Sequence, residues 1–224
     1  MTSENALAEP RVIKVPEDRE QWGTLVEVGS RVIARGGLAV LPTDTLYGVA
    51  CDPFNASAVD SLFKAKGRGR DLPLPVLVHT WRQAVGLVEE VTDQAKSLIA
   101  EFWPGPLTIV LRETPGIGWD LGDSRGTVAL RMPKHDFALA LIERTGPLAV
   151  TSANRSGQPA PSSVGVIVRN LPDVDVFFDA GEASGGPAST IVDLSGPRPR
   201  YLRSGAIPSY EIERVLEEPL VDGA

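Results

Sequence analysis

Short apolar runs alternate with stretches of helical periodicity along the chain, and this alternation constrains the fold more than any other feature of the sequence. It is typical of α/β proteins, in which helices cover the faces of a sheet. The runs predicted to form strands are 38–41, 75–79, 107–111, 127–132, 148–151, 174–179, 189–194 and 199–203. The stretches predicted to form helices are 17–35, 56–66, 92–102, 136–146 and 208–218.

The last three predicted strands follow one another without a helical stretch between them. Parallel neighbours in a sheet need a long crossover, so we expect part of the sheet to be antiparallel. The 224 residues are enough to bury a sizeable core. We expect a single domain over residues 11–218, after a flexible lead-in at 1–10 and before a tail at 219–224.

The composition argues against several classes of protein. The formal net charge of −7 is unlike the basic balance of general nucleic-acid binders. Cys51 is the single cysteine, so no disulfide can form within the chain. The sequence does not start with a basic region and an apolar core, and no apolar run approaches the roughly 18 residues that span a bilayer. A cytoplasmic protein is therefore the expectation.

Polar segments rich in glycine or proline follow several predicted strands. They read PTDTLYG at 42–48, TSANRSGQPAP at 151–161 and RSGAIP at 203–208. Ligands of open α/β sheets usually bind beyond the strand ends, which would place the three segments around one cleft.

Two of these segments each have two interpretations. The hydroxyls of PTDTLYG bond to nearby backbone in a turn, or they line a small-ligand pocket in which Thr43 and Thr45 donate and Tyr47 acts as a lid. The segment TSANRSG is either a turn rich in serine and asparagine or a cradle for ribose or phosphate.

Four cations lie close together in KAKGRGR, at Lys64, Lys66, Arg68 and Arg70. Two cations at the end of a helix would simply complement its dipole. Here the charges continue into a glycine-rich loop, where they repel one another unless an anion lies among them. Arginine makes bidentate contacts with phosphate, so we predict that this cluster binds a polyphosphate.

Two further arginines lie within predicted strands, Arg131 in TVALRMP and Arg203 in YLRSG. Arginine is rarely buried without a partner. Each is therefore either an edge or strand-end residue that faces water or part of a carboxylate clamp at the end of the sheet.

Other catalytic motifs have little support. The segment GDSRG at 122–126 fits the nucleophile elbow G-x-S-x-G, but a loop precedes it and a predicted strand follows, whereas the elbow joins a strand to a helix. His79 and His135 are the only histidines, which disfavours a zinc site or a histidine-based triad. We expect Cys51 to be a small core residue. No phosphate-binding P-loop sequence is present.

Seven segments stand in the order found in the YrdC family, which the chain resembles over about residues 20–210. They read PTDTLYG, KAKGRGRDLPLPVLV, WPGPLTIVL, TVALRMPKH, GPLAVTSANRSGQPAP, STIVDLSG and YLRSGAIP. The resemblance is to the single-domain L-threonylcarbamoyladenylate synthases of that family. It implies a twisted, open α/β sheet of mixed parallel and antiparallel strands, with flanking helices and a concave, positively charged face.

The resemblance also implies a reaction. L-Threonine, bicarbonate and ATP are converted into L-threonylcarbamoyladenylate and pyrophosphate. A separate transferase complex then moves the threonylcarbamoyl group onto adenosine 37 of tRNA. Mg²⁺ would be bound mainly through the ATP phosphates, with no metal ligands from side chains.

Individual residues are implied for each substrate by their matching positions. Lys66 and Arg68 are implied in catalysis. The residues implied in ATP binding are Lys66, Arg68, Arg70, Thr127, Ser152, Asn154 and Arg203. The residues implied in threonine binding are Thr43, Tyr47, Arg131, Val150 and Ser189.

The sequence departs from the family pattern at a few positions. Pro187-Ala188 replaces a Val-Glu pair of many relatives, Ala160 replaces a serine, and Leu77 replaces a histidine. Two rival interpretations stay open: a related carbamoyl transfer, as in hydrogenase maturation, and a non-catalytic RNA-binding module that uses the basic face. The zinc-finger and acylphosphatase modules that accompany the first are missing here, and the acidic net charge disfavours the second.

Overall fold

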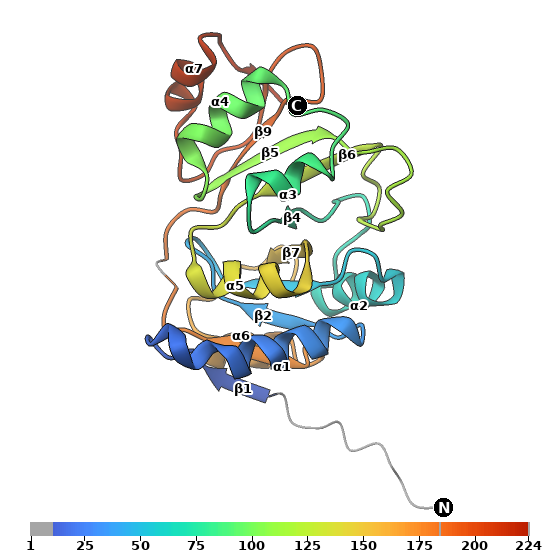
Figure 1. The fold of residues 1–224 in the computed structure, drawn as a ribbon, viewed down its shortest axis with the longest axis vertical. Coiled ribbons are helices and arrows are strands. Elements are labelled where there is room, and N and C mark those ends of the chain that lie inside the picture. The colour runs from blue at the N-terminus through green and yellow to red at the C-terminus, as the bar shows by residue number, and fades with distance from the viewer. Residues whose placement is uncertain (1–10, 184, 224) are drawn as a thin grey trace, which may run out of the picture.

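A single mixed sheet forms the centre of the computed structural model, which describes residues 11–183 and 185–223 (Figure 1). In the described residues the sheet has eleven strands in the order β1-β8-β2-β3-β7-β4-β6-β5-β9-β10-β11. The predicted lead-in at 1–10 and the last residue of the predicted tail lie outside the described residues. The strands are β1 (Arg11–Lys14), β2 (Ala39–Leu41), β3 (Gly48–Cys51), β4 (Val76–Leu77), β5 (Leu107–Arg112), β6 (Thr127–Arg131), β7 (Leu148–Ser152), β8 (Val176–Asp179), β9 (Thr190–Asp193), β10 (Arg200–Arg203) and β11 (Val221–Asp222).

Helices lie on both faces of this sheet. They are η1 (Arg19–Gln21), α1 (Trp22–Ala34), α2 (Ala56–Lys66), α3 (Trp81–Val85), α4 (Asp93–Phe102), α5 (Asp136–Thr145), α6 (Val164–Asn170) and α7 (Ser209–Leu216). No described helix is long and apolar enough to cross a membrane.

The predicted mixture of strand directions is confirmed, and the structure adds the order of the strands. Strands β9 and β10 are antiparallel neighbours, as the missing helix between them predicts. Strand β8, however, does not lie beside β9. It pairs in parallel with β1 and β2, toward the opposite end of the sheet. The chain therefore crosses most of the sheet between β8 and β9, a step that short-range sequence patterns do not reveal.

Local chemistry explains where α2 begins and ends. The Asn55 side chain accepts a hydrogen bond from the Ala58 N–H at 3.1 Å and so caps the first turn. Gly67 ends the helix in the left-handed conformation at φ 59°, which glycine adopts without strain. Lys66, the last residue of α2, is thereby held at a defined position beside the sheet.

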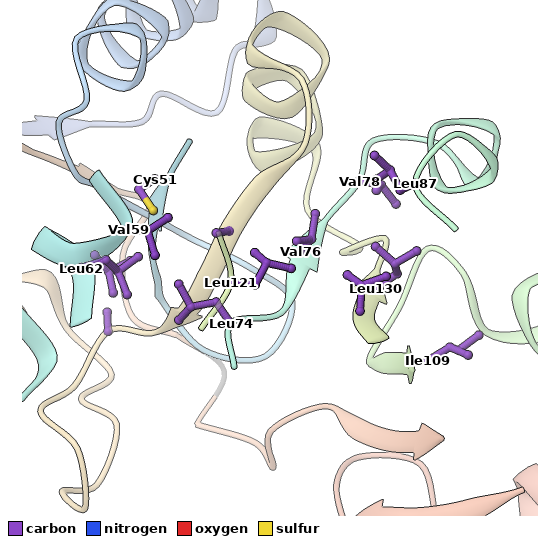
Figure 2. Close-up of a cluster of buried hydrophobic side chains, with 14 of the residues drawn as sticks. Cys51, Val59, Leu62, Leu74, Val76, Val78, Leu87, Ile109, Leu121 and Leu130 are labelled. Carbon is purple, nitrogen blue, oxygen red and sulfur yellow. The ribbon is translucent and has the colours of Figure 1, made fainter. Parts of the chain in front are cut away.

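Two apolar clusters lie on the two faces of the sheet. The larger one, seen in Figure 2 around Cys51, Leu62, Val76 and Leu130, continues along β5, β6 and β9 and packs against α2, α3, α4, α6 and α7. The second cluster lies under α1 and α5 and takes its strand residues from β2, β3, β4, β7 and β8. Among the described residues, β5, β6 and β9 therefore have a covered face and a face that neither cluster occupies.

Candidate functional site

One side of β5, β6, β9 and β10 is covered by neither apolar cluster. Strand register sets Val110 opposite Ala129, and Ile191 opposite both Thr108 and Arg203. Alternation along each strand turns these side chains away from the larger core. Val110, Ala129 and Ile191 are accordingly half-buried, although they are apolar. We call this the open face, made of Thr108, Val110, Ala129, Arg131, Ile191 and Arg203.

Lys66 is buried against the end of β7. Lys66 is only 2% exposed. Its Nζ donates to the backbone oxygens of Ser152 and Asn154 and to Asn154 Oδ1. Burial, followed by the nearby charge of Arg68, lowers the Lys66 pKa to about 8. The structure thus brings together three of the residues that the sequence implies for one ligand.

Of the other three cations of the predicted phosphate cluster, Lys64 is exposed on α2 outside this site, and Arg68 and Arg70 point in different directions. Arg68 turns toward β7, where its Nη1 donates to Thr151 Oγ1 at 3.1 Å, and burial lowers its pKa. Arg70 instead pairs with Asp60 at 2.7 Å and with Asp120, and its hydrogen bond to Asp120 raises its pKa. The basic segment is therefore divided in this structure between Lys66 and Arg68 at β7 and Arg70 among surface carboxylates.

Arg131 is neither an edge residue nor exposed to water. The residue is 7% exposed, and its guanidinium donates to Asp44 Oδ1 at 2.6 Å, to Thr45 Oγ1 at 3.0 Å and to the Gly105 backbone oxygen at 3.0 Å. Burial lowers its pKa, and the Asp44 charge opposes that shift. Three of the five N–H groups of arginine are occupied, which leaves two donors for a ligand.

Asp44 is the residue of this site that the sequence reasoning missed. Its Oδ1 also accepts the Lys134 N–H at 2.9 Å, so it links the segment after β2 to the segment after β6. A signal was present: a buried arginine needs a carboxylate, and Asp44 lies between the two threonines of PTDTLYG.

The turn interpretation of PTDTLYG is confirmed for Thr43. Its hydroxyl donates to the Leu46 backbone oxygen at 2.6 Å and accepts the Thr45 and Leu46 N–H groups. The prediction that Tyr47 is a lid is wrong. Tyr47 is 2% exposed because its ring packs in the larger core. Its hydroxyl donates to the Gly181 oxygen at 2.6 Å and accepts the Ala180 N–H at 3.0 Å.

The glycine after Tyr47 is required by the approach of β3 to β7. A Cβ at Gly48 would lie 2.5 Å from Val150 Cγ1. Val150 itself is buried in the second apolar cluster.

Thr127 stands at the start of β6, and its hydroxyl donates to the Ser124 backbone oxygen at 2.8 Å. Arg131 is four residues along the same strand, so about 13 Å separates the two positions.

Ser189 and Arg203 meet at the other side of the open face. Arg203 donates to the Ser189 backbone oxygen through Nε at 3.0 Å and Nη2 at 2.8 Å, and Nη2 also donates to Ser189 Oγ at 2.8 Å. Burial lowers the Arg203 pKa, and repulsion from Arg131 and Arg68 lowers it further. Ser189 Oγ also bonds to Thr108 Oγ1 at 2.8 Å. No Cβ fits at Gly205, because it would collide with the Ala188 oxygen and the Thr190 nitrogen.

The catalytic motifs that the sequence analysis disfavoured do not belong to the open face or to the end of β7. Ser124 lies in the loop before β6, which supports excluding a nucleophile elbow. Cys51 is fully buried in the larger core, and burial raises its pKa to about 12. Within residues 11–183 and 185–223, no group of three or more His, Cys, Asp and Glu side chains could hold a metal ion. What the open face and β7 do offer is cations and hydroxyls, which can bind and orient anions.

Comparison with known proteins identifies relatives along most of the chain. The family model Sua5/YciO/YrdC, described as telomere recombination, matches residues 31–205. A Mycobacterium tuberculosis protein that carries the provisional name threonylcarbamoyl-AMP synthase is 48% identical over 202 residues, which cover 90% of this chain and 92% of that protein.

Solved structures share the fold. The crystal structure of Pyrococcus abyssi Sua5 complexed with L-threonine has a TM-score of 0.85 and 36% identity, and the match covers 93% of this chain and 62% of that longer one. Escherichia coli YciO has a TM-score of 0.78 at 23% identity, with 88% and 96% of the chains covered, and supports the fold alone.

Proposed function

The chain belongs to the Sua5/YciO/YrdC family, and on that premise we propose that it is a threonylcarbamoyl-AMP synthase acting in tRNA modification. The substrates are L-threonine, bicarbonate and ATP, and the products are L-threonylcarbamoyl-AMP and pyrophosphate. The enzyme is thus a nucleotidyltransferase that makes the activated precursor of N6-threonylcarbamoyladenosine.

One observation carries this proposal: Arg131 and Arg203 hydrogen-bond at the open face, and a third guanidinium, Arg68, hydrogen-bonds at β7. Desolvation lowers the Arg203 pKa, and repulsion from Arg131 and then from Arg68 lowers it further. Of these, Arg131 alone has a carboxylate among its hydrogen-bond partners in the described residues. Like charges held together in a partly desolvated site are costly unless anions bind there. A triphosphate and an amino-acid carboxylate supply that negative charge.

The triphosphate lies, in this proposal, between β7 and the end of α2. Lys66, Arg68 and Arg203 neutralise phosphate charge, and Ser152, Asn154 and Thr127 bind the nucleotide through hydroxyl and amide groups. Arg70 reaches a phosphate only by leaving Asp60 and Asp120, so we assign it the outermost position on the ligand. Mg²⁺ would be held by the phosphates and water and would neutralise charge on the leaving group.

Threonine lies on the Arg131 side. The two unoccupied N–H groups of Arg131 bind its carboxylate, and the Ser189 hydroxyl donates to a substrate oxygen. Thr43, Tyr47 and Val150 shape the pocket more than they donate to it, because the Thr43 and Tyr47 hydroxyls are occupied by backbone groups and Val150 is buried.

The chemistry needs positioning and charge stabilisation but no protein nucleophile. The threonine amine adds to carbon dioxide derived from bicarbonate and loses a proton, which forms a carbamate. A carbamate oxygen attacks the α-phosphorus of ATP; the new O–P bond forms as the bond to the β-phosphate oxygen breaks, and pyrophosphate leaves. Lys66 and Arg68 stabilise the negative charge that develops on pyrophosphate. The product is a reactive mixed anhydride, which a transferase complex then consumes.

The test is release of pyrophosphate from ATP and bicarbonate, with and without L-threonine. We expect release that depends on threonine and is abolished in Lys66→Ala. Lys64→Ala is the matched control, because Lys64 is an exposed lysine on the same helix. No release from the wild-type protein, together with salt-sensitive RNA binding, would support the RNA-binding alternative instead. Wild-type turnover in Lys66→Ala would count against the role of Lys66.

A further inference from the structure

Thr108 is the most deeply buried residue of the open face, and its hydroxyl hydrogen-bonds to Ser189 alone among the described residues. It is the second residue of β5, it is 2% exposed, and its hydroxyl lies 2.8 Å from Ser189 Oγ. Ser189 is also buried, at 5% exposure. Neither hydroxyl can therefore exchange freely with water, and their protons must be assigned to partners within the site.

The pattern of acceptors decides which hydroxyl donates to the other. Either direction leaves one proton of the pair without an acceptor among the described residues; if Ser189 donated, that proton would be on Thr108, the more deeply buried of the two. A buried donor without an acceptor is costly. Donation from Thr108 to Ser189 leaves the unpaired proton on Ser189 instead, beside Arg203, where an anionic ligand oxygen can accept it. Ligand binding therefore favours this direction.

This arrangement fixes the role of Ser189. Its oxygen has two lone pairs, and both are occupied, one by Thr108 and the other by Arg203 Nη2 at 2.8 Å. The Ser189 proton then has no acceptor in the described part of the chain and is available to a ligand. Ser189 can act only as a donor, and its donation is strengthened because it already accepts from a cation.

We propose that Thr108 is a positioning residue that makes the Ser189 hydroxyl an obligate donor to an anionic oxygen of the amino-acid substrate. The proposal rests on the proposed function, since it deepens the threonine half of that site. It also separates the two substrates, because the Thr108–Ser189 pair should affect threonine and leave ATP unaffected.

The experiment compares Thr108→Val with Thr108→Ser by titration of the protein with L-threonine and, separately, with MgATP. Thr108→Val removes the hydroxyl at similar volume and should weaken threonine binding about five- to tenfold, the usual effect of one hydrogen bond to a charged or polar partner. Thr108→Ser keeps the hydroxyl and should stay within about twofold of wild type. ATP affinity should stay unchanged in both variants. Thr108→Ala serves as a second hydroxyl-free variant if the valine variant does not fold.

Two controls show whether Thr108 acts through Ser189. Thr145→Val makes the same chemical change in α5, where the hydroxyl bonds to the Leu141 and Gly146 oxygens, and should leave both affinities unchanged. In a Ser189→Ala background, Thr108→Val should have no further effect, because the group it positions is gone.

The outcomes separate the failure of this proposal from the failure of the proposed function. A wild-type protein that does not bind threonine would overturn the function. If the wild type binds threonine, any one of three results overturns the role of Thr108 alone: unchanged binding in Thr108→Val, equal losses in the valine and serine variants, or a further loss in the Ser189→Ala background.

Discussion

Lys66 should make ATP binding depend on pH, because its ammonium group is buried. Burial and the charge of Arg68 lower its pKa from 10.5 to about 8. A triphosphate is attracted to the protonated ammonium and not to the neutral amine. ATP affinity should therefore be greatest well below pH 8, where Lys66 is protonated. It should fall as the pH rises through that value.

The size of the effect follows from the protonated fraction of Lys66. With a pKa of about 8, roughly nine-tenths of the free protein carries the ammonium at pH 7, about half at pH 8 and about a tenth at pH 9. Affinity should then fall about tenfold between pH 7 and pH 9, equivalent to about 1.4 kcal/mol. An exposed lysine, with its pKa near about 10.4, would give almost no change over this range.

Calorimetric titration with MgATP from pH 7 to pH 9.5 measures this dependence. Threonine is left out, because its own ammonium loses a proton in the same range. Lys66→Arg is the control, since arginine stays charged throughout and should give a flat profile even if it binds more weakly. A flat profile for the wild type, or the same decline in Lys66→Arg, would refute the reasoning that the charge of a buried ammonium attracts the phosphates.

Two further substitutions test how the site is held together. Asp44→Ala removes the counter-charge of the buried Arg131 and should lower the free energy of unfolding, measured in urea, by about 3–5 kcal/mol. Asp44→Asn keeps an acceptor oxygen and should lower it less. A larger loss in Asp44→Asn than in Asp44→Ala would contradict this reasoning. Gly205→Ala forces a Cβ into the backbone around Ser189 and should reduce threonine-dependent pyrophosphate release at least about tenfold. Gly165→Ala, with nothing within 4 Å of the new Cβ, should leave release unchanged, and equal activity of the two variants would contradict the packing argument.

The elements of the fold could be predicted where side-chain pattern and end signals agree. The helix predicted at 56–66 occupies those residues, with Asn55 and Gly67 at its ends, because both signals are local. Strands β1, β3 and β11 and helices α3 and α6 were missed. Each is two to seven residues long, which is too short for periodicity to distinguish it from a loop.

The order of strands could not be predicted, because it depends on long-range packing. Nothing local to Val176–Asp179 indicates that this strand pairs with β1 and β2 and not with β9. The same limit applies to the site. The sequence identified Arg131 as an unusual charge in a strand, but not the pairing with Asp44, which is 87 residues away. The roles of the remaining site residues in binding stay predictions.

The segment PTDTLYG acts mainly by positioning other parts of the site. Its polar side chains are directed inward: Asp44 and Thr45 hold the Arg131 guanidinium. Tyr47 holds the backbone at Ala180 and Gly181, where the chain leaves β8 on its way to Ser189. One short loop therefore fixes both Arg131, the cation that we propose to bind the substrate carboxylate, and the start of the segment that carries Ser189. A substitution in this loop should for that reason disturb threonine binding even where the altered side chain never touches threonine.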